Sequence, residues 1–213
     1  MAADSKIAKF MRSPFLWIPV ALCFPFLMEM VMTIHSTTFR KTNGPSPIMI
    51  KTHMIGTAVW QYTLFHHGAY PEGKSSTEVF QQLINEEFIT DPTVFFEERF
   101  KIPGKTKASS RTLRPENVCW DVTVPLDSNS PDALPLVFLT GFRVQYTSGG
   151  SATPLFPWAK DWTGIAVLYK GDGARWLMND RQPNGMVTNF ISQAFEPAGK
   201  KYVQLTPDGP LGP

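Results

Sequence analysis

IMIKTHMIGTAVWQYTLFHHGAYPEGKSSTEVFQQLINEEFITDP, residues 48–92, holds two apolar patterns of helical period on either side of a Gly/Pro turn. Apolar side chains spaced by three, four and seven residues fall on one stripe of a helix and leave the opposite stripe in solvent. The first pattern places these residues on or beside one face: Ile48, Met54, Ile55, Ala58, Val59, Tyr62 and Phe65. The stretch therefore predicts two amphipathic helices at the start of a folded domain.

Local signals indicate where these helices end and begin. After the first helix, Gly68 suits a left-handed cap and Pro71 cannot continue a helix. Ser75 lies three residues before Glu78, which is the spacing of a capping box. The apolar face of the second helix then consists of Val79, Phe80, Leu83, Ile84 and Phe88. The second helix should follow Ser75, and Thr-Asp-Pro at residues 90–92 should end it.

The segment Pro14–Ile34 is apolar over the length that crosses a bilayer. Its only ionisable side chain is Glu29, and as a helix it would span roughly 30 Å. No small-x-small cleavage motif follows it, which favours a retained anchor over a signal peptide. The sequence therefore predicts a short N-terminal segment (residues 1–13), a transmembrane helix (14–34) and a linker rich in Gly and Pro (35–47).

Basic residues on the two sides of this segment set its expected orientation. Three of them precede it, at positions 6, 9 and 12, and two follow it, at positions 40 and 41. The positive-inside rule then favours a cytoplasmic N-terminus. We expect a single-pass protein of the inner (cytoplasmic) membrane whose domain faces the periplasm.

Trp17 and Glu29 are the candidate interface residues of the apolar segment. A carboxylate inside a membrane is expensive unless a partner satisfies it, so Glu29 suits contact with an integral membrane protein. The alternative is that Glu29, near the end of the segment, reaches the membrane surface. The lipid bilayer and an integral membrane protein complex are the expected partners.

Beyond residue 114 the sequence favours strands. Val118–Val124 alternates in part, and Pro135–Tyr146 is an apolar run rich in strand-forming residues. Gly164–Met178 contains an Asp-Gly pair between two apolar runs, which is a strong hairpin signal. We expect an α+β domain over residues 48–196 and a surface tail rich in Gly and Pro over residues 197–213.

Composition excludes some classes of function. The chain carries 20 basic and 18 acidic residues, so it lacks the positive charge that nucleic-acid binding requires. Its two cysteines, Cys23 and Cys119, lie in different segments, which makes a disulfide between them improbable. We expect no nucleic-acid partner.

Residues able to support catalysis or bind a metal are scattered. His66 and His67 are adjacent, so on a helix their side chains point about 100° apart and cannot easily face one ion. Asp161 and Asp172 flank one strand without the dense oxygen ligands that calcium requires. Cys119 has no nucleophile motif around it and reads as a buried strand residue. We predict no catalytic residue, no metal site and no cofactor.

Aromatic residues gather in and after the loop 148–162. Phe156, Trp158 and Trp162 are candidate interface residues, because aromatic side chains are enriched in binding hot spots. The alternative is that they cover the sheet as part of its core, since Trp is highly buried on average. The sequence leaves both readings open.

Several of these segments together resemble the pseudopilin-like proteins of type II secretion and type IV pilus systems. The resemblance rests on the N-terminal anchor, the helix ending in Phe-His-His-Gly-Ala-Tyr-Pro (65–71), Thr-Asp-Pro (90–92) and the hairpin Val-Leu-Tyr-Lys-Gly-Asp-Gly-Ala-Arg-Trp-Leu (167–177). It implies a pilin-like head in which one or two helices pack on a small antiparallel sheet. The family's leader places a glycine before its cleavage site, whereas here Phe24–Glu29 has none, and Gly44 and Pro45 interrupt the helix that would continue from the anchor.

The sequence thus predicts a pilin-like head on an ordinary anchor. Its expected role is that of a non-catalytic accessory or structural subunit docked on a larger membrane complex, which would be respiratory, photosynthetic or secretory. One alternative is a pseudopilin or minor pilin of a type II secretion or type IV pilus system. Another is a membrane-tethered enzyme or metal-binding protein that uses His66, His67 or Asp172.

Overall fold

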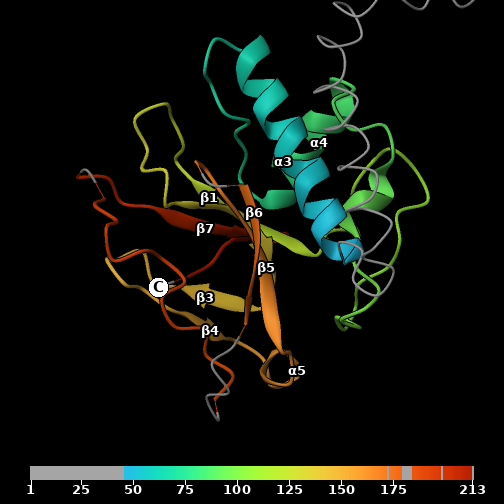
Figure 1. The fold of residues 1–213 in the computed structure, drawn as a ribbon. Helices are drawn as coiled ribbons and strands as arrows, with labels where there is room; N and C mark the ends of the chain where they lie inside the picture. Colours follow the sequence, from blue (N-terminus) through green and yellow to red (C-terminus); the bar gives the residue numbers. More distant parts are fainter. Residues whose placement is uncertain (1–45, 172, 179–183, 198, 213) are drawn as a thin grey trace, which may run out of the picture. The chain divides into compact units, whose positions relative to one another are not determined.

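The computed structural model describes residues 46–171, 173–178, 184–197 and 199–212. At its centre is an antiparallel sheet with the strand order β6-β5-β2-β1-β7-β8 (Figure 1). Its strands are β1 (Trp120–Val124), β2 (Pro135–Leu139), β5 (Gly164–Tyr169), β6 (Gly173–Met178), β7 (Val203–Thr206) and β8 (Gly209–Pro210). A second sheet pairs β3 (Phe142–Val144) with β4 (Ala152–Pro154).

The central strands carry apolar side chains on both faces. Every residue of β2 and β5 is buried, and both strands read as continuous apolar runs. A strand reads this way when other elements cover both of its faces. The predicted hairpin is present, with Gly173 at φ 72° and paired with Tyr169. The Asp-Gly signal worked because a glycine adopts this backbone conformation at little steric cost.

Two helices, α3 (Pro47–Phe65) and α4 (Ser76–Asn85), pack on the sheet. Gly56 of α3 lies against Leu168 of β5, where a Cβ atom would come within 2.8 Å of the leucine Cδ1. The hydroxyl of Ser76 donates a hydrogen bond of 2.7 Å to the carbonyl of Trp120 in β1. The two helices confirm the pair expected between residues 48 and 92. The shorter helices are η1 (Pro92–Phe95), η2 (Pro115–Asn117) and α5 (Pro157–Lys160).

The helix caps follow the sequence signals. Gly68 has φ 91°, as the left-handed cap requires, and His67 before it also has a positive φ of 53°. The hydroxyl of Ser75 accepts a hydrogen bond of 3.2 Å from the Glu78 N–H. The Glu78 carboxylate accepts one of 2.8 Å from the Lys74 N–H. Both hydrogen bonds therefore cap the N-terminus of helix α4.

We expect Ser75→Ala to lower the free energy of unfolding by about 1 kcal/mol, because the Glu78 N–H loses its partner at the first turn of α4. Urea denaturation followed by circular dichroism measures this loss. Ser109→Ala, at an exposed serine outside any helix, is the matched control and should change stability by less than about 0.5 kcal/mol. Equal stability losses in the two variants would contradict the capping role.

The side chain of Gln204 in β7 joins the two sheets. Its amide donates to an Asp121 carboxylate oxygen in β1 at 2.7 Å and to the Phe142 carbonyl in β3 at 2.6 Å. Its carbonyl accepts from the Val144 N–H at 3.1 Å. All of these polar groups are buried, so the side chain satisfies atoms that would otherwise be left unpaired.

The predicted fold class is wrong. We expected an α+β, pilin-like head with a small sheet behind a transmembrane helix, and the structure has a six-stranded antiparallel sheet with helices packed on it. Within the described residues, no helix combines the length and the apolar character needed to cross a bilayer. The predicted transmembrane helix at Pro14–Ile34, with Trp17 and Glu29, lies outside those residues.

Much of the extra sheet comes from residues 197–213, where the sequence suggested a surface tail. There β7 pairs with β1 along the register Val122↔Leu205, and β8 pairs with β7. Gln204 and Leu205 are buried. The Gly and Pro residues that suggested a tail lie on either side of a four-residue strand, β7. The partner of this strand is far away in the sequence, so no local sequence pattern predicts the pairing.

Candidate interaction surface

Helix α3 is apolar on two opposite faces. Its buried residues are Ile48, Thr52, Ile55, Ala58, Val59 and Tyr62. Its exposed large apolar side chains, called here the α3 face, are Ile50, Met54, Trp60, Leu64 and Phe65, and each has 46–74% of its surface exposed. At about 100° per residue these two sets fall on opposite sides of the helix. The α3 face therefore groups five apolar side chains on one side of the helix, with the exposed His53 and Thr57 between them.

The α3 face carries no charge. The only Asp, Glu, Lys or Arg in α3 is Lys51, and its ammonium group turns toward the domain. The Lys51 Nζ donates to the Phe96 carbonyl at 2.5 Å and lies 3.4 Å from the buried carboxylate of Glu97. A solvated helix face usually carries charged side chains, and a group of exposed apolar residues typically marks an interaction site. The α3 face has the composition of a contact surface.

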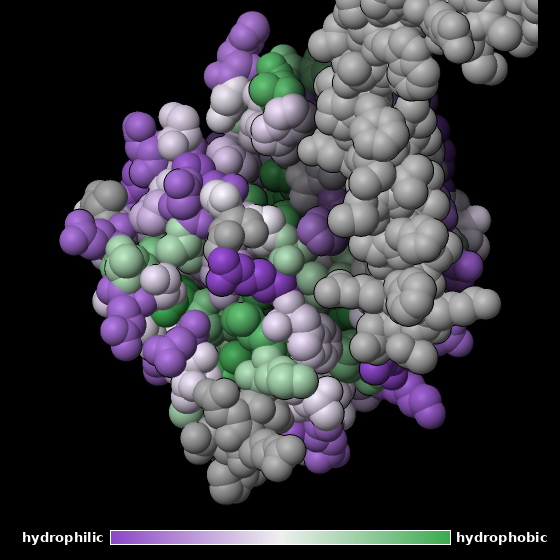
Figure 2. Space-filling view, viewed as in Figure 1, coloured by the Kyte–Doolittle hydropathy of each residue, from purple (hydrophilic) through white to green (hydrophobic). Residues whose placement is uncertain are grey.

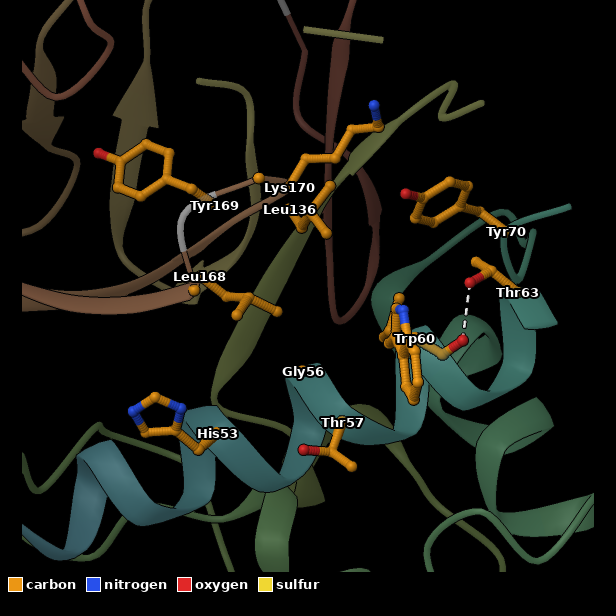
Figure 3. Close-up of a pocket in the computed structure, with 13 residues that line it drawn as sticks. His53, Gly56, Thr57, Trp60, Thr63, Tyr70, Leu136, Leu168, Tyr169 and Lys170 are labelled. Carbon is orange, nitrogen blue, oxygen red and sulfur yellow. Dashed lines mark hydrogen bonds between the residues drawn. The ribbon is translucent and has the colours of Figure 1, made fainter. Parts of the chain in front are cut away.

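A groove of about 280 Å³ runs beside the α3 face (Figure 3). His53, Thr57 and Trp60 contribute its helical wall, and Leu136 and Leu168 of the sheet line it across from them. The Thr63 hydroxyl donates to the Trp60 carbonyl at 2.7 Å. Because Gly56 has no side chain, Leu168 reaches the helix backbone between His53 and Trp60. The groove thus offers a second apolar surface next to the α3 face.

Two polar side chains that line the groove, those of Lys170 and Tyr70, present no unpaired charge to it. Lys170 extends away from α3, and its Nζ donates to the carbonyls of Ser130 at 2.5 Å and Ser128 at 3.0 Å. Burial raises the pKa of Tyr70, with the nearby Asp132 as a further cause, so its hydroxyl is neutral at neutral pH. An apolar partner at this groove would meet no unpaired charge from either residue.

The C-terminal end of α3 is fixed by ring contacts. The His66 ring stacks on Tyr62 with the centroids 4.0 Å apart, and its Nε2 lies 2.5 Å from the Glu86 carboxylate. Phe65 approaches Phe88, with 5.7 Å between ring centroids, and stays 74% exposed. Figure 2 shows apolar surface exposed at the top of the view, where α3 ends.

The metal candidates do not form a cluster where the structure describes them. His66 is paired with Glu86, and Asp172 lies outside the described residues. Among the residues that are described, no three His, Cys, Asp or Glu side chains are grouped as a metal site would require.

Cys119 and Glu97 also lie where they cannot easily serve catalysis. Cys119 is fully buried just before β1, as the sequence suggested, and its Sγ accepts from the Glu97 N–H at 3.4 Å. Burial raises the pKa of the Cys119 thiol to about 11, so the reactive thiolate is scarce at neutral pH. Glu97 is 4% exposed, and its carboxylate pairs with Lys51 and accepts a hydrogen bond of 3.0 Å from the Arg99 N–H.

The aromatic candidates lie away from α3 in sequence and are stacked together. The rings of Phe156 and Trp158 lie 5.2 Å apart and nearly parallel, and Trp158 and Trp162 are also 5.2 Å apart. Trp162 is buried and packs on Phe100 and Phe142, so it belongs to the core. Phe156 remains 47% exposed. Trp162 therefore follows the core reading, and contact of Phe156 with a partner stays a prediction.

Sequence reasoning missed most of the α3 face. Ile50, Trp60 and Leu64 were not singled out, and Met54 and Phe65 were assigned beside the buried stripe, whereas they are 46% and 74% exposed. The available signal was the near absence of charge from a 19-residue helix. A helix with apolar residues on two opposite faces buries both of them only when a second surface covers the outer face.

Comparison with known protein families, curated proteins and solved structures gives no match to this chain.

Proposed function

We propose that this protein is a non-catalytic accessory subunit that docks through the α3 face on an apolar helix of a larger membrane protein complex. The observation that carries the proposal is the uncharged group of five large apolar side chains exposed on α3. Burying such a side chain stabilises an interface by about 1.5–3 kcal/mol relative to leaving it in water. A face of this kind contributes most when another apolar surface covers it.

The position of the face along the chain supports a membrane protein as the partner. Twelve residues, 35–46, separate the end of the apolar run Pro14–Ile34 from the start of helix α3 at Pro47. If that run lies in the bilayer, as its length and composition suggest, the start of α3 lies within about 40 Å of the membrane surface. Integral membrane proteins at that surface are then within its reach.

Site-specific crosslinking in the protein's native membranes tests this proposal. A photoreactive amino acid at position 64, near the C-terminal end of the α3 face, should crosslink the full-length chain to an integral membrane protein. The same probe at Met178, which is 68% exposed but lies on β6, should give no such product. A Trp60→Glu substitution combined with the probe should reduce the crosslink about tenfold or more, because a carboxylate cannot enter an apolar interface cheaply.

Circular dichroism and urea denaturation of the Trp60→Glu chain supply the folding control, since the residue is 61% exposed and its replacement should leave the domain folded. The proposal fails if position 64 crosslinks only to a second copy of the chain. It also fails if position 64 crosslinks to soluble proteins only, or if the Trp60→Glu substitution leaves the product unchanged.

A further inference from the structure

A second cavity, of about 540 Å³, lies away from α3. It is bounded by the loop 102–105, the ends of β1 and β2, the turn between β7 and β8, and the segment 155–158 that leads into α5. Its volume falls within the range of small-molecule sites. None of the residues of the α3 face lines it.

The buried carboxylate of Asp121 lines this cavity with one oxygen unpaired. Asp121 is completely buried, and its Oδ2 accepts the hydrogen bond from Gln204. The Thr140 side chain also lies within hydrogen-bonding range of this carboxylate and lowers its pKa. The buried Oδ1 nevertheless has no hydrogen bond of good geometry among the described residues. Buried polar atoms in native proteins are almost always paired, so a buried and unpaired carboxylate oxygen beside a cavity indicates a missing donor.

The charge around the cavity favours a cation. The lining residues carry three carboxylates, Glu116, Asp121 and Asp208, and one ammonium group, that of Lys105. Glu116 also lies 3.8 Å from Arg114 Nη1, so Asp121 and Asp208 are the carboxylates left to face a ligand. Lys105 Nζ already donates to the Pro115 carbonyl at 2.8 Å, and burial lowers the pKa of this side chain. Burial raises the pKa of Asp121 to about 7, with Thr140 and Gln204 opposing that shift, and a bound cation would stabilise its ionised form.

The aromatic wall fits the rest of such a ligand. Phe156 and Trp158 both line the cavity, stacked at 5.2 Å with 10° between their ring planes. The exposed Phe156 offers a ring face to a ligand, and ring faces attract ammonium and guanidinium groups. Trp158 is held in place because its ring packs over Gly141, a residue with no side chain.

We propose that this cleft binds a small organic cation, an alkylammonium or alkylguanidinium group, which donates a hydrogen bond to Asp121 Oδ1 and lies against Phe156 and Trp158. The ligand's N–H group pairs the carboxylate oxygen that the fold leaves open. Its positive charge offsets the excess of carboxylates, and its alkyl chain covers the aromatic wall. Nothing in this site depends on docking through α3.

Isothermal titration calorimetry with the full-length chain tests this inference. Butylguanidinium and butylammonium are the probes, and butyrate and 1-butanol share their chain length without the positive charge. We expect saturable binding of the two cations only. Asp121→Asn should weaken that binding about tenfold or more, and Phe156→Ala about two- to fivefold. Glu98→Gln removes one negative charge at an exposed residue outside the cleft and should leave the affinity unchanged.

The outcomes separate the alternatives. Equal binding of butanol or butyrate would mean a merely apolar pocket, and equal binding by wild type and Asp121→Asn would place the cation elsewhere; either result overturns the proposal, as does the absence of saturable binding. Thermal denaturation of Asp121→Asn confirms that a loss of binding does not come from unfolding. The Trp60→Glu variant should bind the cations as the wild type does, so failure of this site and failure of docking through α3 are distinguishable.

Discussion

Substituting alanine for Gly141 is expected to lower the free energy of unfolding by about 3 kcal/mol. Gly141 has φ 101°, a backbone conformation that strains any residue with a Cβ atom, at a cost of about 1–2 kcal/mol. The new Cβ would also lie 2.5 Å from Cη2 and 2.9 Å from Cζ3 of Trp158. Displacing a packed ring adds about 1–3 kcal/mol. Urea denaturation at constant pH measures the sum.

Gly104→Ala provides the matched control for this substitution. Gly104 also has a positive φ, 73°, but nothing lies within 4 Å of the position that a Cβ would take. Only the backbone strain remains, so the expected loss is about 1–2 kcal/mol. If the two variants lose the same stability, the Trp158 ring moves away from the new Cβ at no cost in free energy. Gly141 then has no role in placing the aromatic wall of the cleft.

Asp121→Asn is expected to change how stability depends on pH. Burial raises the pKa of Asp121 in the folded protein to about 7, from the ordinary aspartate value of 3.8. The folded state therefore binds this proton more tightly than the unfolded state does. Stability contributed by the protonated acid is fully present below about pH 4 and is lost as the pH rises to about 7. The loss amounts to about 4 kcal/mol, because one pKa unit corresponds to about 1.4 kcal/mol.

The asparagine variant does not titrate, so its free energy of unfolding should lack this fall and should exceed that of the wild type at pH 8. Urea denaturation from pH 4 to pH 8 on both proteins isolates the difference. Asp91→Asn is the control of opposite sign, because the Thr93 N–H lowers the pKa of Asp91 and its stabilisation is lost only as the solution becomes more acidic. A wild-type fall that persists in Asp121→Asn would assign the titration to another group.

Local signals predicted the helices and the hairpin of this fold. The period of the apolar residues indicated α3 and α4, Ser75 marked the start of α4, and the Asp-Gly pair located the turn between β5 and β6. Each of these features depends on residues within a few positions of one another. Periodicity, capping and turn chemistry act over that distance, so sequence reasoning reaches them.

Features made by distant residues were not predictable in the same way. The sheet is larger than expected because β7 pairs with β1 across more than 70 residues. The apolar run 135–146 divides into β2 and β3 because Gly141 turns the chain under Trp158. An apolar run shows that residues are buried, but it does not show which sheet they join.

The candidate sites illustrate the same limit. Asp121 reads in the sequence as one polar residue of a partly alternating strand, and its unpaired oxygen appears only once Gln204, 83 residues later, takes the other one. The cavity beside it brings together the loop 102–105, Trp158 and Asp208 from segments that share no motif. The α3 face, in contrast, was predictable, because the sequence alone shows a predicted helix with a single charged residue.

The pairing of β7 with β1 has a consequence during synthesis of the chain. Strand β1 is synthesised before both of its neighbours in the sheet. One of its edges can pair with β2 as soon as β2 is made, but the other edge has no partner until β7, which ends at residue 206, has been made. During that interval the edge of β1 that later pairs with β7 is unpaired and can pair with other strands. Asp121 and the Phe142 carbonyl also lack their hydrogen bonds from Gln204 until β7 is made.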